Sequence, residues 1–205
     1  MKLSRIIKNG LFIILFTVLA LFFSTETASA HCDTLDGPVV SAARKAMKTG
    51  NANYILVWVK PGSEDEIRKA LKRAKTKKKA AKTRLEKDRA EMELFEVLVR
   101  IHREGEGAKY EGIKPAGSIE PEIALADKAV ETGKLDDVLN QVKSAANREI
   151  ILHLFHEVKE KSNYDVDNVP AGREFIEAYV VFVHAVEKAI NGQALKEGHL
   201  HNHRV

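Results

Sequence analysis

An apolar segment near the amino terminus determines where a folded domain of this chain can begin. Residues 11–23 carry no charge, follow a start with three basic residues, and precede a short polar stretch that ends in Ala28-Ser29-Ala30. A basic start, an apolar run and a small-residue A-x-A motif are typical of a secretory signal peptide. The run of 13 residues is too short for an ordinary membrane span, although an uncleaved anchor is the alternative. We therefore expect a cut after Ala30 and export, to the periplasm or outside the cell.

Cleavage there would divide the chain into three parts. They are a signal peptide at 1–30, a helical bundle domain at 31–192 and a flexible, histidine-containing tail at 193–205. The net charge of +4 would fall to +2, because residues 1–30 hold three basic residues and one acidic residue. The single cysteine, Cys32, cannot form an internal disulfide. A lone thiol in an oxidising compartment is a liability unless it is buried, bound to something or paired between chains, which leaves a homo-oligomer open.

Proline and glycine punctuate a sequence whose apolar residues otherwise follow a helical period. Ser63 and Glu66 form a capping-box pattern at one expected helix start. The residues of Asn51–Val59 also suit a strand, but their setting favours a short helix. The expected helices are Asp36–Gly50, a short one in Asn51–Val59, a basic one from Ser63, one ending near Arg103, Pro121–Gly133, a bent one over Leu135–Lys161, and Asn168–Ile190. The predicted class is all-α, four-helix-bundle-like with additional short helices.

Cleavage would give the pair His31-Cys32 a specific chemistry. The cut exposes the amine of His31, so that the amine, the His31 imidazole, the Cys32 amide and the Cys32 thiolate lie within two residues. Sulfur combined with nitrogen favours copper, nickel or zinc, and a tetragonal arrangement favours copper or nickel. Asp33 and Asp36 could add oxygen ligands or outer hydrogen bonds. The simpler interpretation is a processed terminus that packs against the helices.

The residues "HCD" directly after a signal resemble the amino-terminal metal hook of nickel superoxide dismutase, whose subunit is also a helical bundle. The resemblance implies that His31 and Cys32 are metal ligands and, if the protein is an enzyme, a metal oxidoreductase of the superoxide-dismutase type. Asp36 stands in the place of the second hook cysteine, and the hook tyrosine is missing, with Val39 in its neighbourhood. Metal capture tolerates this departure better than redox catalysis does.

A broader resemblance covers the length of the chain after residue 30. The segments HCDTLDGPVV, VRIHREGEGAKYEGIKPAG and GREFIEAYVVFVHAVE are similar to a family of uncharacterised exported prokaryotic proteins. This resemblance implies export and a helical fold, and it implies no activity.

Further polar residues lie on the expected helices. We expect the hook, if it folds back over the bundle, to meet His102, His184 or Glu96. His184 lies in the otherwise apolar run YVVFVHAV, for which a hydrogen-bonded core histidine is the simpler interpretation. The tail histidines at 199, 201 and 203 could also chelate metal.

The stretch Lys69–Lys87 contains ten basic residues and one acidic residue. A solvated helix face is the simplest explanation, because the interleaved alanines offer little apolar surface. An anionic membrane surface is the functional alternative. Nucleic acid is not expected as a partner of an exported protein.

Overall fold

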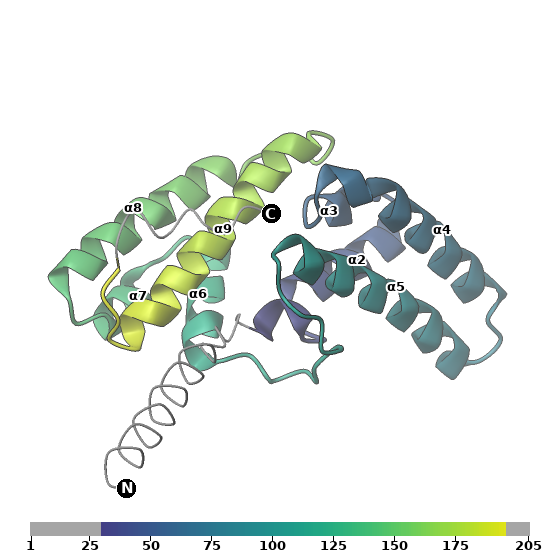
Figure 1. Cartoon of the computed structure of the whole chain (residues 1–205), viewed down its shortest axis with the longest axis horizontal. Helices are drawn as coiled ribbons and strands as arrows, with labels where there is room; N and C mark the ends of the chain where they lie inside the picture. Colours follow the sequence, from purple (N-terminus) through teal and green to yellow (C-terminus); the bar gives the residue numbers. More distant parts are fainter. Residues whose placement is uncertain (1–29, 196–205) are drawn as a thin grey trace, which may run out of the picture.

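The computed structural model describes residues 30–195 and, within that range, consists of α-helices and short 3-10 turns without a β-strand (Figure 1). The predicted all-α class is therefore confirmed. The helices are α2 (Pro38–Thr49), α3 (Asn53–Leu56), α4 (Glu64–Ala80), α5 (Arg84–Gly105), α6 (Pro121–Thr132), α7 (Asp136–Gln141), α8 (Ala145–Lys161) and α9 (Val169–Ile190), with 3-10 turns η1 (Ala30–Asp33) and η2 (Pro61–Ser63). The expected signal peptide, apart from Ala30, and the tail histidines lie outside the described residues.

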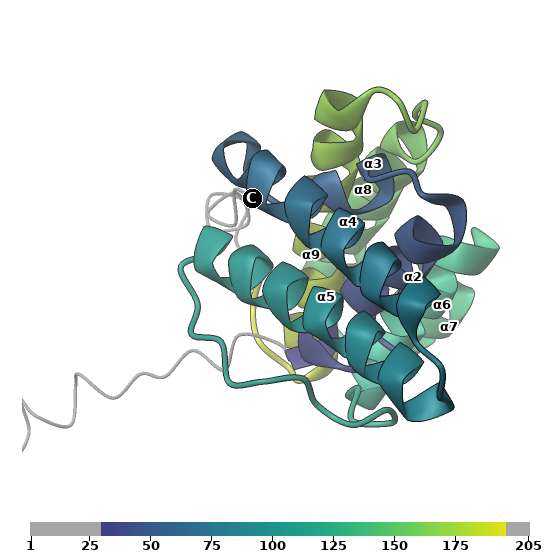
Figure 2. The same cartoon turned by 90° about the vertical axis from the view of Figure 1, so that its right-hand side faces the viewer.

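The four long helices form two hairpins, α4 with α5 and α8 with α9, and shorter helices connect them (Figures 1 and 2). Helices α2 and α3 lie beside the first hairpin, and α6 and α7 lie beside the second. The turn η1 packs against α2, between the two hairpins. The amino-terminal residues of the described chain are consequently placed in the middle of the molecule.

The hairpin of α4 and α5 is capped differently from the sequence expectation, both at its start and at the turn between its helices. The side chain of Ser63 makes no capping hydrogen bond at the start of α4. The capping box is instead formed by Thr83 and Glu86, where the Thr83 side chain accepts from the Glu86 amide and Glu86 accepts from the Thr83 amide. This box breaks the basic stretch into two helices, because it fixes the extended backbone of Thr83 at the start of α5.

A second break separates α7 from α8, where a single bent helix was expected. Residues 142–144 are not helical, and the Ser144 side chain caps α8 by accepting from the Asn147 amide. The Arg148 guanidinium donates to the Val142 carbonyl at 2.7 Å, which satisfies a carbonyl left open by the end of α7. In the described part of the chain, no helix is long and apolar enough to cross a membrane.

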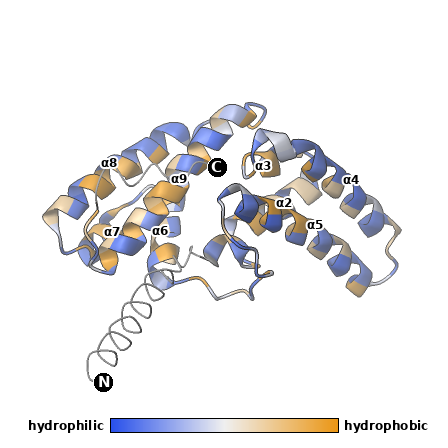
Figure 3. Cartoon of the chain, viewed as in Figure 1, coloured by the Kyte–Doolittle hydropathy of each residue, from blue (hydrophilic) through white to orange (hydrophobic). Residues whose placement is uncertain are grey.

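One continuous core joins the two hairpins. Helix α9 supplies much of it, since most of its residues from Ile176 to Ala189 are buried. Gly172 allows α9 to approach Val57 at the end of α3 closely, because a Cβ atom at residue 172 would lie 2.4 Å from a methyl group of Val57. Hydrophilic residues dominate α4 and the adjoining end of α5 instead, as Figure 3 shows. The core therefore ends well before the tip of the α4–α5 hairpin.

Candidate functional site

Backbone hydrogen bonds hold the segment that contains His31 and Cys32 inside the molecule. The Lys114 amide donates to the Asp33 carbonyl at 2.8 Å, and the Leu35 amide donates to the Lys114 carbonyl at 3.0 Å. The loop before α6 thus clamps the end of η1. The chain then turns sharply at Gly37, where a Cβ atom would lie 2.0 Å from the His31 carbonyl oxygen. Only glycine fits this turn, and Pro38 starts α2 immediately afterwards.

The side chains of His31 and Cys32 are buried together, with exposed fractions of 1% and 4%. Cys32 Sγ lies 3.9 Å from Nδ1 and 3.8 Å from Nε2 of the His31 ring. These near-equal distances mean that the sulfur does not lie in front of either nitrogen. A single ion bound by both groups would therefore require rotation of the imidazole about its side-chain bonds.

Helix α9 contributes two polar side chains beside His31. Tyr179 Oη lies 3.4 Å from His31 Nε2 and donates a hydrogen bond of 2.5 Å to Asp127 Oδ1 on α6. The His184 ring lies edge-on to the His31 ring, with 6.4 Å between the centroids. His184 Nδ1 contacts Glu187 Oε2 at 3.1 Å. Because a carboxylate only accepts, Nδ1 carries the proton in this pair.

Helix α5 contributes a charged group on another side of the segment. Arg103 lies between Asp33, at 3.6 Å, and Glu106, at 3.2 Å. His102 Nδ1 donates to the Trp58 carbonyl at 2.9 Å, and His102 Nε2 lies 3.4 Å from Glu106 Oε1. Asp33 Oδ1, Arg103 Nε and His102 Nε2 are buried without a hydrogen-bond partner among the described residues. Arg103 Nη1 donates a hydrogen bond to Glu106, whereas the contact between Arg103 and Asp33 is an ion pair without a hydrogen bond.

Burial shifts the protonation of this cluster towards neutral forms. Burial, reinforced by the nearby His184, lowers the pKa of His31 to about 3. Burial, together with the carboxylates of Glu106 and Asp33, raises the pKa of the Cys32 thiol. Burial also raises the pKa of Tyr179, with Asp127 adding to the effect. Near neutral pH the site therefore holds a neutral imidazole, a thiol and a phenol.

The structure brings together most of the residues that the sequence singled out. Buried His31, Cys32, Asp33 and His102 and the mostly buried His184 all belong to the cluster. Two others lie elsewhere: Glu96 is exposed on α5, and Asp36 is exposed, with its carboxylate accepting from the Gly117 amide at 2.8 Å. That hydrogen bond lowers the pKa of Asp36 and ties it to the loop before α6. The Asp36 carboxylate therefore stabilises the loop before α6 and makes no hydrogen bond with Cys32.

Sequence reasoning missed Tyr179, Asp127, Arg103 and Glu106. A signal existed for Asp127, which lies four residues after Ile123 and therefore on the apolar face of α6. A carboxylate on such a face needs a buried donor, and Tyr179 provides it. No comparable signal marks Arg103 or Glu106, which continue a run of charged residues at the end of α5.

The side chains alone do not form a conventional metal centre. Across residues 30–195, no group of three or more His, Cys, Asp or Glu side chains is arranged to hold a metal ion. The donors proposed from the sequence differ from such a group, since two of the four are the backbone amine and amide of residues 31 and 32. The amine would exist only after cleavage at Ala30.

Comparisons with known proteins identify the family of this chain. Residues 36–185 match the model of a family of unknown function, DUF6448, and the chain belongs to that family. The matched segment begins at Asp36, so His31 and Cys32 precede it. No curated protein and no solved structure matches the chain.

Proposed function

We propose that this is an exported metal-binding protein that holds one transition-metal ion, copper or nickel in preference to zinc, through its processed terminus at His31 and Cys32. The ligands are the His31 amine and imidazole with the Cys32 amide and thiolate. The observation that carries the proposal is the shared burial of the two side chains, with the sulfur within 3.9 Å of both ring nitrogens. Chain termini usually lie at the surface, so burial of this one indicates that its side chains have a role inside the protein.

The donor set fits a transition metal chemically. The lowered pKa of His31 keeps its imidazole neutral, which is the form that binds metal. The thiol of Cys32 must lose its proton on binding, and the positive ion supplies the charge that favours this loss. Asp33, Glu106 and Asp127 are the acidic groups whose charges act on Cys32. They would offset part of the positive charge of a bound ion.

A structural module of the cell envelope, without metal, is the second candidate. The same burial favours it, because His31 and Cys32 fill space between α5, α6 and α9 and add to the core. Under this alternative, Cys32 is protected from oxidation only by being buried.

Metal analysis of the processed protein separates the two candidates. The chain is produced in an exporting host, mass spectrometry establishes its first residue, and bound metals are quantified. We expect one ion per chain in the wild type and none in Cys32→Ser. A variant with the tail residues His199, His201 and His203 changed to glutamine should keep its ion.

Two controls make the result specific. His153→Ala removes an exposed histidine from α8 and should leave metal content unchanged, whereas His31→Ala should abolish it. One extra residue before His31 should weaken binding, because it removes the terminal amine from the ligand set. An absence of stoichiometric metal in the wild type would overturn the proposal and leave the structural module. Superoxide turnover by the metal-loaded protein would extend it to the dismutase type of enzyme.

A further inference from the structure

The free end of the α4–α5 hairpin is a strongly basic part of the described surface. Residues 75–89 hold eight basic and two acidic residues. None of their side chains is buried, since the last buried residue of α4 is Ala74 and the first of α5 is Ala90. This tip, defined as residues 75–89, therefore projects beyond the core (Figures 1 and 2). The basic side chains of the tip are therefore not needed to form the core.

Ion pairs neutralise only part of the charge on the tip. Lys77 pairs with Glu93 at 2.7 Å, Lys78 pairs with Glu91, and Arg84 pairs with Asp88 at 3.0 Å. The remaining basic side chains have no ion pair with another described residue, and they are Lys75, Lys79, Lys82, Lys87 and Arg89. A positive field is thus left on the surface at this end of the molecule.

An apolar side chain stands in the middle of this positive surface. Leu85, in the first turn of α5, is 59% exposed, and Ala80 beside the turn is also exposed. The turn between the helices is held in place by the Thr83–Glu86 capping box and by the Lys82 amide, which donates to Glu86. Leu85 is therefore presented at a fixed position rather than on a mobile loop.

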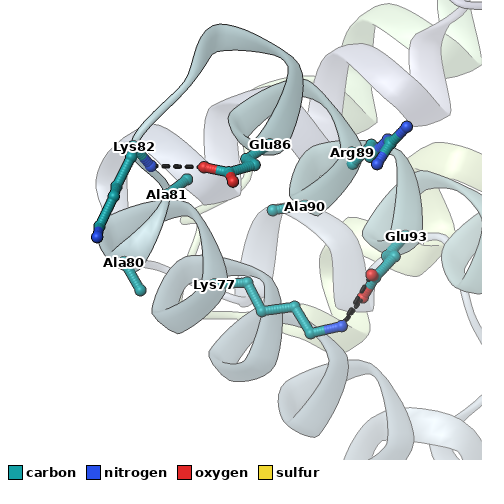
Figure 4. A pocket seen from close by; sticks show the side chains of 8 residues that line it. All are labelled: Lys77, Ala80, Ala81, Lys82, Glu86, Arg89, Ala90 and Glu93. Carbon is teal, nitrogen blue, oxygen red and sulfur yellow. Dashed lines mark hydrogen bonds and ion pairs between the residues drawn. The ribbon is translucent and has the colours of Figure 1, made fainter.

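A shallow, open hollow lies on the surface directly beside the turn. It has a volume of about 480 Å³ and is lined by Lys77, Ala80, Ala81, Lys82, Glu86, Arg89, Ala90 and Glu93 (Figure 4). Glu86 and Glu93 are both engaged in the interactions drawn there, with the Lys82 amide and with Lys77. Lys82 and Arg89 also line the hollow, and neither side chain forms an ion pair with another described residue.

We infer that the tip of the α4–α5 hairpin binds the surface of an anionic lipid bilayer. The basic side chains adsorb to the acidic headgroups, and Leu85 enters the boundary between headgroups and acyl chains. Charge complementarity identifies a polyanionic partner, and the exposed leucine between the cations selects a bilayer over nucleic acid. Nucleic acid would use the cations and would gain nothing from an apolar side chain that points outward. The inference is independent of metal binding at His31 and Cys32.

Vesicle partitioning of the processed full-length protein tests this inference. The wild type is compared on vesicles of phosphatidylcholine alone and of phosphatidylcholine with phosphatidylglycerol, at low and high salt. We expect binding to the anionic vesicles that high salt weakens. Lys79, Lys82 and Lys87 changed together to glutamine should lower the partition coefficient on the order of a hundredfold. Leu85→Ser should lower it about tenfold.

Matched controls remove the same charge and the same apolar surface elsewhere. Glutamine at Lys109, Lys134 and Lys143, all exposed, changes the net charge equally. Leu152→Ser removes the other large exposed apolar side chain of residues 30–195, which is 50% exposed on α8. Both controls should retain wild-type binding. Folding of every variant is checked by circular dichroism, and the tip variants should remain folded because they replace exposed residues only.

Three results would overturn the inference. The first is equal binding of the wild type to both kinds of vesicle. The second is an equal loss of vesicle binding in the tip variants and in their controls, which would show that binding depends on net charge or on nonspecific hydrophobic adsorption. The third is binding to duplex DNA, but not to vesicles, that depends on the tip lysines and is unaffected by Leu85→Ser.

Discussion

Tyr179 on α9 donates a hydrogen bond of 2.5 Å to Asp127 on α6, and the same hydroxyl lies 3.4 Å from His31 Nε2. This hydroxyl is the point at which two helices and the amino-terminal segment meet. Tyr179 is almost completely buried, so its hydroxyl and the Asp127 carboxylate depend on each other for hydrogen bonding. The contact couples the helical frame to the residues proposed to bind metal.

Removing this hydroxyl should destabilise the protein. Tyr179→Phe leaves the mostly buried Asp127 carboxylate without its donor, and we expect a loss of about 1–3 kcal/mol in the free energy of unfolding, measured with urea. Tyr164→Phe is the matched control, because Tyr164 is only half-buried and its hydroxyl makes no hydrogen bond with a described residue. That control should remain within about 0.5 kcal/mol of the wild type.

A double-mutant cycle assigns this loss to the pair. If the hydrogen bond is responsible, Tyr179→Phe should cost less in an Asp127→Ala background, which has no acceptor, and the two effects should not add. Additive effects would contradict the prediction, since they would mean that the phenol acts through packing alone.

Local sequence patterns predicted some residues of the amino-terminal site but not others. His31 and Cys32 were found because a cleavage motif precedes them. Tyr179 lies 148 residues from His31, and no local pattern links them. His102 and His184 were expected to meet the amino-terminal segment, but the sequence could not distinguish them from Glu96, which is exposed. Such contacts depend on how the hairpins pack, which is a long-range property.

The helices were predictable where apolar periodicity is strong, as in α9. The break at residues 81–83 was missed for a physical reason. The sequence offers two capping boxes, Ser63 with Glu66 and Thr83 with Glu86, and both satisfy the same pattern. Lysine and alanine favour helix on each side of Thr83, so local propensity would also allow one long helix. In the structure the second box forms at the start of α5, whereas Ser63 makes no capping hydrogen bond at the start of α4.

The turn at Gly37 should tolerate no side chain. In Gly37→Ala, the new Cβ would lie 2.0 Å from the His31 carbonyl oxygen, and a backbone atom cannot move away cheaply. We expect a loss of about 3 kcal/mol, measured by urea denaturation. The displaced segment should also expose Cys32, so that a thiol reagent reacts faster with the folded variant than with the wild type.

Gly62→Ala is the control for this prediction. A Cβ at Gly62 meets no atom within 4 Å, so stability and thiol reactivity should both stay close to the wild type. Normal stability of Gly37→Ala, or unchanged protection of Cys32, would show that the amino-terminal segment can be rebuilt without its present turn.

Metal removal should lower thermal stability if His31 and Cys32 bind an ion. A ligand at a hundred times its dissociation constant stabilises the folded state by about 2.7 kcal/mol. For a chain of this size, removal of that ion by a chelator should lower the melting temperature by roughly 5–10 °C. Cys32→Ser should show no such shift, whereas the variant with glutamine at the three tail histidines should show it fully. An equal shift in Cys32→Ser would place the ion elsewhere.

The ion pair between Arg173 and Glu64 should give stability a defined pH dependence. Arg173 donates to the Val59 and Leu56 carbonyls and to Glu64, the last at 2.5 Å, and so ties α9 to α3 and α4. The hydrogen bond from Arg173 lowers the pKa of Glu64 below its ordinary value of 4.5. A carboxyl group with a lowered folded-state pKa stabilises the protein above its unfolded-state pKa, and this contribution is lost as the pH falls through the folded-state value.

Glu64→Gln should therefore reduce stability by about 1 kcal/mol near neutral pH, a value typical of a partly exposed pair. The difference from the wild type should shrink in acid, where the wild-type carboxyl group is protonated as well. Urea denaturation at neutral and acidic pH measures both. Asp65→Asn is the control, since Asp65 is exposed in the same turn of α4 and forms no ion pair with a described residue. A difference that does not change with pH, or that Asp65→Asn reproduces, would exclude a specific contribution from the pair with Arg173.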